Sequence, residues 1–264
     1  MEPRRGMIEP GLSYPVAVAG GAVIGLLLAV FGGGGSVLAT PLLLYGVGVR
    51  DPHVAIGTSA AAVAVNAASG LFLQARAGQV KWPCALVFGG AGLAGSLTGA
   101  HVAKQIDGQA LLLWFALAMA LVGGSMLLPR TSPGDPDVRI NNRLMLRLAP
   151  AGLAVGLAAG FFGIGGGFLI VPGLMAATGM TLANAAASSL VSVVLFGSAT
   201  SLSYAASGLV DWRVFAALVA GGVLGAIAAG PVSRRLAGRA DVARRLFAVL
   251  VLMTAGYVAW RAGS

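Results

Sequence analysis

The stretch Phe31-Gly32-Gly33-Gly34-Gly35-Ser36 interrupts an apolar region that covers residues 15–49. A second stretch, Phe162-Gly163-Ile164-Gly165-Gly166-Gly167, interrupts the apolar region 148–178 in the same way. Glycine is among the poorest helix formers, so a run of glycines ends a helix and frees the backbone. Each region is therefore predicted to form two short segments rather than one continuous helix.

The composition is that of a membrane-embedded protein. Of the 264 residues, 58% are hydrophobic and only 9% are charged, whereas soluble domains carry roughly a quarter charged residues. This excludes a water-soluble globular protein, and the high hydrophobicity excludes a disordered chain. The single cysteine, Cys84, leaves no disulfide framework or thiolate cluster. No cofactor or metal is expected, and the basic residues lie between apolar segments, which indicates membrane topology rather than nucleic-acid binding.

Six uninterrupted apolar segments are suited to cross a bilayer as helices, since a core of about 30 Å needs about 20 residues. They cover residues 54–73, 83–103, 109–128, 184–206, 214–232 and 246–260. The last is slightly shorter and ends in Tyr257 and Trp260, aromatic residues of the kind found at membrane interfaces. Residues 36–49 would span only about 21 Å as a helix. Whether the interrupted regions cross fully or re-enter therefore stays open.

The two halves of the chain resemble one another. Four sets of matching residues, separated by 130 or 131 positions, relate them. They are Phe31-Gly32 with Phe162-Gly163, Pro41 with Pro172, Gly78-x-Val80-x-Trp82 with Gly208-x-Val210-x-Trp212, and Gly92 and Gly95 with Gly222 and Gly225. Matches at nearly one offset indicate an internal repeat.

The repeat divides the chain into a first transmembrane repeat (residues 1–128), a polar cytoplasmic linker (129–147) and a second transmembrane repeat (148–264). Each repeat would contain an interrupted glycine-rich hairpin followed by three transmembrane helices. If each hairpin enters and leaves on one side, eleven basic residues lie on one side of the membrane and six on the other. A single crossing gives a weaker asymmetry. We therefore predict an all-α polytopic membrane protein built from inverted repeats, with both termini outside.

Both glycine-rich stretches are candidate anion-binding segments. A helix N-terminus carries unpaired N–H groups and about half a positive charge, which favours an anion. Transporters built from inverted repeats bind the substrate where helices break near the membrane midplane. The predicted binding residues at the two helix starts are Gly34, Gly35 and Ser36, and Gly165, Gly166 and Gly167. The alternative is that these glycines only permit a kink or close helix packing.

Polar pairs in the spans that follow the breaks are further candidates. Thr58-Ser59 and Ser188-Ser189 occupy matching places in the two repeats. Their hydroxyl groups are predicted to line a pathway or to hydrogen-bond an oxyanion. The alternative is that they hold helices together or bond to carbonyl groups of their own helices.

Glycines at four-residue spacing predict close helix packing. The patterns are Gly95-x-x-x-Gly99, Gly152-x-x-x-Gly156-x-x-x-Gly160 and Gly221-x-x-x-Gly225. This spacing puts the glycines on one helix face, where a neighbouring backbone can approach. A structural role is predicted for all of them. Because packing glycines occur on several faces, a homodimer is compatible with the sequence but is not established by it.

The acidic residues all lie in loops or at segment ends. They are Glu2, Glu9, Asp51, Asp107, Asp135, Asp137, Asp211 and Asp241. An intramembrane proton relay or sodium site uses an embedded acid, so any coupling must use other groups. The sequence has no phosphate loop, metal-ligand cluster or soluble domain, and Val37 follows Ser36 where an intramembrane serine hydrolase has glycine. We predict that the protein is not an enzyme and has no catalytic residue.

Several motifs in both halves match a known family when they are taken together. They are Phe31-Gly32-x-Gly34-Gly35 with Pro41, Ala55-Ile56-Gly57-Thr58-Ser59, Gly78-x-Val80-x-Trp82, and the counterparts Phe162-Gly163-Ile164-Gly165-Gly166-Gly167 with Pro172, Ala187-Ser188-Ser189 and Gly208-x-Val210-x-Trp212. From about Val16 to Trp260 the chain resembles the TauE/SafE family of sulfite exporters. The resemblance implies a multi-pass permease of the bacterial inner membrane for sulfur-containing anions such as sulfite, thiosulfate or organosulfonates. It supports transport more strongly than any one substrate.

We therefore expect a secondary transporter or facilitator of small sulfur-containing oxyanions. It would bind the anion at paired glycine-rich helix N-termini near the membrane midplane and move it by rocking one repeat against the other. An anion channel with the same lining is the first alternative. Unlike a transporter, it would show neither saturation nor exchange. A membrane enzyme is the second alternative. The expected partners are the lipid bilayer and a small anionic substrate.

Overall fold

The computed structural model describes residues 13–127, 134–135, 138, 141–162, 167–237 and 240–263. Within these ranges the chain forms helices and connecting loops, with one isolated bridge between Asp135 and Met180 and no strand. The first half contains α1 (Ser13–Phe31), η1 (Gly32–Leu38), α2 (Ala39–Pro41), η2 (Leu42–Val47), α3 (Pro52–Arg76), α4 (Trp82–Ala103) and α5 (Gly108–Leu127). The second half contains α6 (Asn142–Phe162), α7 (Gly167–Thr178), α8 (Leu182–Ala205), α9 (Trp212–Ala237) and α10 (Ala240–Gly263).

Three aspartates begin helices. Asp51, at the N-cap of α3, accepts a hydrogen bond from the backbone N–H of His53 at 2.8 Å. Asp107 and Asp211 accept bonds in the same way from N–H groups in the first turns of α5 and α9. A carboxylate at this place satisfies an unpaired N–H group and complements the positive end of the helix dipole. For these three acids the predicted position at a segment end is confirmed.

The described residues include seven segments that are long and apolar enough to cross a membrane, by length and composition. Large apolar side chains cover the outside of the bundle, and Leu146, Leu202, Ile227 and Met253 each expose 70% or more of their surface. Soluble monomers rarely expose large contiguous apolar patches, whereas a lipid-facing surface consists of them. The described part of the chain is therefore all-helical and holds seven candidate membrane spans.

The first interrupted region folds back on itself. α1 ends at Phe31, and Gly32 then adopts a φ of +64°, which a residue without a Cβ tolerates best. The segment from η1 through the π-helical η2 returns along α1, so that Gly46 lies beside Val16. The region thus starts and finishes at the same end of the bundle. The sequence had left this point open.

A second hairpin consists of α6 and α7. Val155 in the middle of α6 lies beside Gly173 in α7, and a Cβ on this glycine would be 3.0 Å from Val155 Cγ2. α6 begins at Asn142, earlier than the apolar region starting at 148 had indicated, so it includes residues expected in the polar linker. Helices often extend beyond the apolar span into polar residues, because their N-terminal turn lies at the interface.

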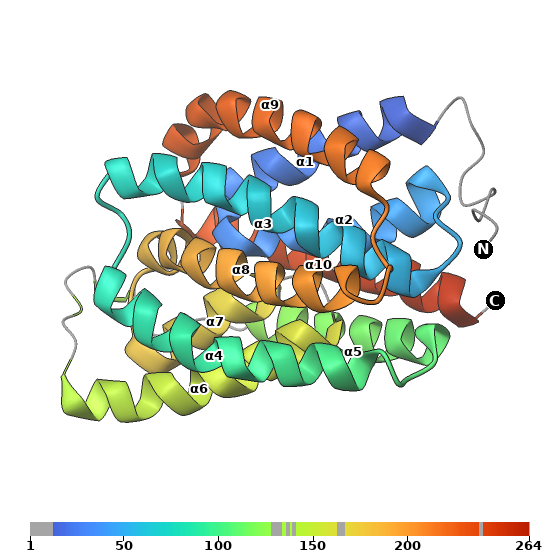
Figure 1. Cartoon of the computed structure of the whole chain (residues 1–264). Helices are drawn as coiled ribbons and strands as arrows, with labels where there is room; N and C mark the ends of the chain where they lie inside the picture. Colours follow the sequence, from blue (N-terminus) through green and yellow to red (C-terminus); the bar gives the residue numbers. More distant parts are fainter. Residues whose placement is uncertain are drawn as a thin grey trace.

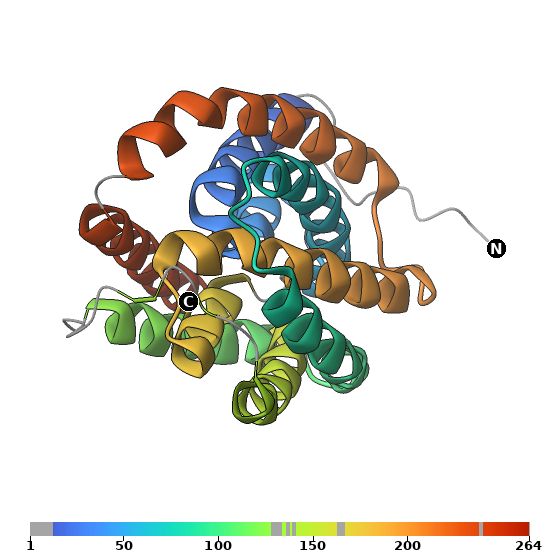
Figure 2. The ribbon, with the colours of Figure 1, turned by 90° about the vertical axis from the view of Figure 1, so that its left-hand side faces the viewer.

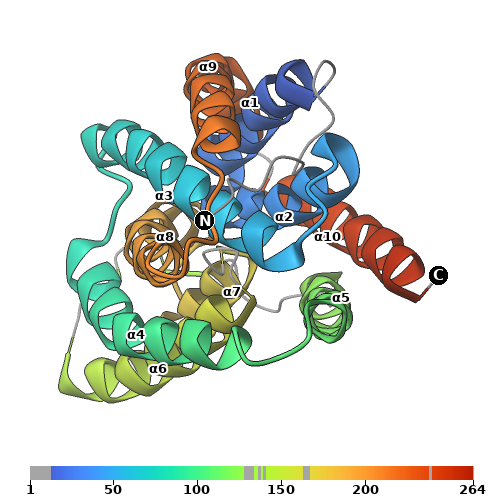
Figure 3. The same ribbon diagram turned by 45° about the vertical axis from the view of Figure 1, so that its right-hand side comes forward.

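Helices from the two halves pair across the molecule. α1 packs against α9, α4 packs against α6, and α3 and α8 contact each other (Figure 1). In Figure 1 the α1–α9 pair lies along the top, the α4–α6 pair along the bottom, and α3 and α8 between them. Figure 2, turned by 90°, shows the same order from top to bottom. α5 contacts α10, and both lie on one side of this group in Figure 3. The halves are therefore interlocked.

Direct backbone contact holds two of these pairs together. A Cβ on Gly156 of α6 would overlap the backbone of Gly92 in α4, and a Cβ on Gly25 of α1 would overlap the backbone of Gly222 in α9. The other glycines of the four-residue patterns also face backbone atoms of the partner helix, namely Gly95, Gly99, Gly152, Gly160, Gly221 and Gly225. Their predicted role in close packing is confirmed.

Replacing Gly156 with alanine is expected to lower the free energy of unfolding by about 1–3 kcal/mol, because the methyl group overlaps the Gly92 backbone. Gly90→Ala on α4 is the matched control, since nothing lies within 4 Å of a Cβ there. The control should keep or slightly raise stability, because alanine favours a helix by about 1 kcal/mol over glycine. Melting temperatures of the two variants in detergent test this, and equal values would contradict the proposed role of backbone contact.

Candidate functional site

The two glycine-rich stretches meet at a buried backbone contact between Gly33 and Gly167, which we call the glycine crossing. Gly33 lies in the first turn of η1, and Gly167 is the first residue of α7. A Cβ on Gly33 would lie 2.8 Å from the Cα of Gly167, and a Cβ on Gly167 would overlap the Gly33 carbonyl group. Only residues without side chains approach this closely. Short helical segments from both halves thus begin at one point in the interior.

Two serine hydroxyls bond to the backbone of Gly33. The N–H of Gly33 donates to Ser189 Oγ at 2.9 Å, and Ser36 Oγ donates to the Gly33 carbonyl oxygen at 2.9 Å. The Ser189 hydroxyl donates in turn to the carbonyl of Ala186 at 2.7 Å. Both serines are fully buried. Ser189 therefore connects η1 of the first half to α8 of the second.

A pair of hydroxyl groups lies farther along the first hairpin. Thr40 Oγ1 and Ser59 Oγ are 2.8 Å apart, and the Ser59 hydroxyl also donates to the carbonyl of Ile56 at 3.0 Å. Sequence reasoning did not single out Thr40 or Gly33. Thr40 gave a weak signal as a polar residue directly before Pro41. Gly33 was passed over because the short helix was expected to begin at Gly34 rather than two residues earlier, at Gly32.

The other predicted glycines have separate surroundings. Gly34 faces the ring of Phe247 in α10, since a Cβ on Gly34 would lie 2.6 Å from Phe247 Cε2. Gly35 faces the backbone of α1 where Leu27 joins Leu28. Both glycines are buried and pack the hairpin against its neighbours. Gly165 and Gly166 lie outside the residues that the structure describes.

Thr58 and Ser188 do not join the glycine crossing. Thr58 Oγ1 accepts a hydrogen bond from the backbone N–H of Asp211 at 2.8 Å, and Ser188 Oγ accepts one from the N–H of Lys81 at 2.9 Å. These bonds lie at opposite ends of the bundle. Successive residues of a helix point about 100° apart, so each predicted pair separates, with Ser59 and Ser189 facing the broken hairpin. Thr58 and Ser188 instead connect each central helix to the loop before α9 or α4.

The buried polar side chains are uncharged among the residues that the structure describes. They are Ser36, Thr40, Thr58, Ser59, Asn66, Ser96, Asn184, Ser188, Ser189, Ser192, Thr200 and Thr254. Charged side chains that lie in apolar surroundings need a partner or a change of protonation. An interior of hydroxyl, amide and backbone dipoles can stabilise an anion through hydrogen bonds without a fixed counter-charge.

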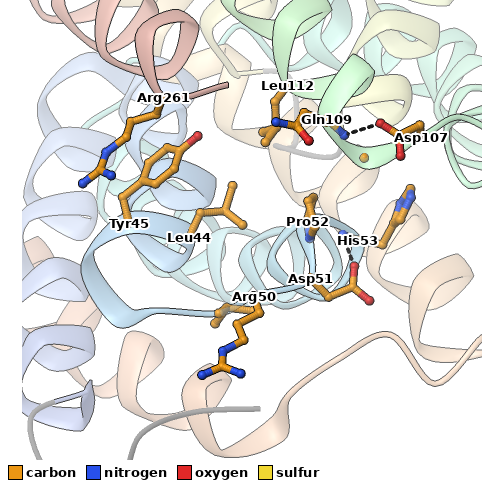
Figure 4. A pocket seen from close by; sticks show the side chains of 12 residues that line it. Leu44, Tyr45, Arg50, Asp51, Pro52, His53, Asp107, Gln109, Leu112 and Arg261 are labelled. Carbon is orange, nitrogen blue, oxygen red and sulfur yellow. Dashed lines mark hydrogen bonds between the residues drawn. The ribbon is translucent and has the colours of Figure 1, made fainter. Parts of the chain in front are cut away.

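A cavity of about 550 Å³ opens where α3 and α5 begin and α10 ends (Figure 4). Arg50, His53 and Arg261 are among the residues that line it. Leu112 lines the cavity and belongs to an apolar cluster that includes Val37, Phe115, Phe168 and Phe247. Because Phe247 touches Gly34, this cluster extends from the cavity to the residues beside the glycine crossing.

Replacing Thr58 with valine is expected to lower the free energy of unfolding by about 1–3 kcal/mol, because the partly buried N–H of Asp211 loses its acceptor. Thr58→Ser should restore most of this loss. Thr98→Val is a matched control, since the Thr98 hydroxyl bonds only to carbonyls of its own helix. Melting temperature and the exchange rate of the Asp211 amide hydrogen measure the effect. Weaker anion binding with unchanged stability would instead support the predicted binding role.

Comparison with known proteins identifies the family. The family model described as Sulfite exporter TauE/SafE matches residues 17–258. A probable membrane transporter protein of Xylella fastidiosa (strain Temecula1) is 44% identical over 250 residues, which cover 94% of this chain and 96% of the relative. The probable membrane transporter protein YunE of Bacillus subtilis is 27% identical over 246 residues, covering 85% and 90%. No solved structure matches the chain. The chain therefore belongs to the TauE/SafE sulfite exporter family and is a membrane transporter.

Proposed function

We propose that this transporter is a permease for small sulfur-containing oxyanions, such as sulfite, thiosulfate or organosulfonates, and that the anion binds beside the glycine crossing. The observation that supports this most is the meeting of two helical N-terminal segments at Gly33 and Gly167. A helix start carries about half a positive charge, and its first N–H groups point away from the helix. The Gly33 N–H is bonded to Ser189, so a bound anion would replace that hydroxyl as its acceptor. Two helix N-termini that meet at one buried point would attract an anion without the help of a basic side chain. The proposed ligands include Gly165 and Gly166 as well.

Hydroxyl groups supply the hydrogen bonds that a desolvated oxyanion requires. Ser36, Ser59 and Ser189 each donate a hydrogen bond to the backbone carbonyl three residues earlier in the chain. A hydroxyl rotates about its C–O bond, so its proton can turn from the carbonyl to an anion oxygen. Transport by this route needs no covalent step, and we assign no catalytic residue.

We further propose that the two halves are inverted repeats in the bacterial inner membrane. Their helices exchange partners reciprocally, since Thr58 of the first half bonds to the residue before α9, and Ser188 of the second half bonds to the residue before α4. Basic residues support the orientation. Arg143 and Arg147 begin α6 at the end of the bundle where Arg76 and Lys81 lie, which we assign to the cytoplasm.

The moving part in this proposal is the α5–α10 pair rather than one whole repeat. Glycine contacts join the backbones of α1 and α9, and of α4 and α6, so that sliding one repeat past the other would separate both contacts. α10 carries Phe247, whose ring lies against Gly34. A shift of α10 relative to the other helices would therefore uncover the residues beside the glycine crossing.

Counterflow of labelled thiosulfate in proteoliposomes tests the function. The wild type should show saturable exchange that sulfite and organosulfonates inhibit. Gly167→Ala should reduce the exchange rate at least about tenfold. Overpacking costs about 1–3 kcal/mol, and here the added methyl group would displace the residues that are proposed to bind the anion. Gly124→Ala on α5 is the control, since nothing lies within 4 Å of a Cβ there.

Three results would count against the proposal. Flux without saturation or exchange would identify a channel. Absence of exchange with any of these anions, from protein shown to be folded, would remove the oxyanion assignment. Equal exchange by Gly167→Ala and Gly124→Ala would place the anion away from the glycine crossing.

A further inference from the structure

The cavity at the start of α3 contains chemistry that the glycine crossing does not have. Figure 4 shows Arg261 and Tyr45 on one side of it and Asp107 and His53 on the other, with Arg50 and Asp51 below. It therefore combines basic side chains with a histidine, whereas the interior that the structure describes has only uncharged polar groups. The inference drawn from this cavity rests on the proposed function.

Arg50 and Arg261 bring two guanidinium groups to the cavity. Asp51 and Asp107 lie there as well, but each carboxylate accepts backbone N–H bonds at a helix start, and the positive end of that helix offsets much of its charge. Arg50 is an exposed side chain at the rim. The Arg261 guanidinium lies 5.8 Å from the centre of the Tyr45 ring and 5.9 Å from that of Tyr257. These aromatic rings help to hold the guanidinium at the cavity.

The inner wall of the cavity has a buried polar atom without a partner among the described residues. His53 Nδ1 is buried and makes no hydrogen bond there. The His53 ring stacks on that of Tyr204, with centres 6.2 Å apart, and the buried hydroxyl of Tyr204 also lacks a partner. Nearly all buried polar atoms in proteins are hydrogen-bonded. Because the Nδ1 atom is buried, a ligand in the cavity would bond to His53 only after its ring turned toward the cavity.

The cavity and the glycine crossing are separate places. The apolar cluster that includes Leu112, Phe115 and Phe247 lies against the inner part of the cavity and against Gly34. An anion in the cavity would be partly hydrated, since Arg50 and Arg261 are exposed. An anion at the crossing would be dehydrated, since Ser36 and Ser189 are fully buried. A transported ion must lose its water between the two.

We infer that the cavity lined by Arg50, His53 and Arg261 is a second anion-binding site, which takes small oxyanions from the outer solution before they reach the glycine crossing. The basic rim raises the local anion concentration, and the volume of about 550 Å³ accommodates an oxyanion with part of its hydration shell. The cavity thus determines the apparent affinity for anions in the outer solution, whereas the glycine crossing determines the maximal exchange rate.

The Arg50→Gln variant tests this inference in vesicles of one orientation. It should raise the half-saturating concentration of outside thiosulfate about tenfold and leave the maximal exchange rate unchanged. The effect should shrink as ionic strength rises, because salt screens exposed charges. Arg50→Lys should restore most of the affinity. Arg213→Gln is the matched control, since Arg213 is an exposed arginine at the same end of the bundle, at the start of α9 and outside the cavity.

Equal half-saturating concentrations for Arg50→Gln and Arg213→Gln, with the wild type active in exchange, would overturn this inference alone. If the wild type does not exchange thiosulfate, the proposed function fails. In that case, equilibrium binding of labelled thiosulfate to the same variants tests whether the cavity binds an anion, independently of exchange. Weaker binding only in Arg50→Gln would support it, and equal binding in both variants would sink it.

Discussion

The broken helices put backbone N–H and C=O groups inside an apolar interior, and the surrounding structure satisfies them. In hydrocarbon an unsatisfied backbone group costs several kcal/mol, so non-helical backbone at this depth must be enclosed by protein. At Gly33 both groups are bonded, the N–H to Ser189 and the carbonyl oxygen to Ser36. The helices beside the break, α3 and α8, are also the most buried candidate spans, with 67% and 78% of their apolar windows inside the protein.

Enclosing the hairpins requires the neighbouring helices to come very close, and small residues make this possible. Gly25 and Gly222 bring α1 against α9, while Gly92 and Gly156 bring α4 against α6. Between lipid-exposed helices there is little hydrophobic driving force, so dispersion contacts between backbones have to provide the attraction. The abundance of glycine in this chain therefore serves two purposes, breaking α1 and α6 and packing the helices that cover the breaks.

Much of the fold could be predicted from the sequence, because apolar length and glycine spacing act locally. Five of the six uninterrupted spans are among the candidate membrane spans, and the sixth, residues 246–260, lies within α10. Both breaks also follow from these local signals. The candidate site was harder to predict, since it depends on which face of a helix meets which neighbour. Thr58 and Ser59 look equivalent in the sequence, yet a rotation of about 100° sends one to the Asp211 amide and the other to Thr40. Residue spacing also could not show that η1 begins before Gly34, because four successive glycines offer several equivalent starts.

The two halves differ at the crossing, and the difference bears on how an anion could be released. The Gly33–Ser189 bond joins the halves, whereas the Thr40–Ser59 bond lies within the first. At the offset of 131 residues Thr40 corresponds to Val171, so the second hairpin lacks this hydroxyl. A shift of α10 that displaces η1 from α8 would break the first bond and free the Gly33 N–H, while Thr40 and Ser59 can move together as a unit. An anion held by both hairpins would thus lose ligands from one half before the other, and a bound anion would itself bridge the halves in place of the Gly33–Ser189 bond.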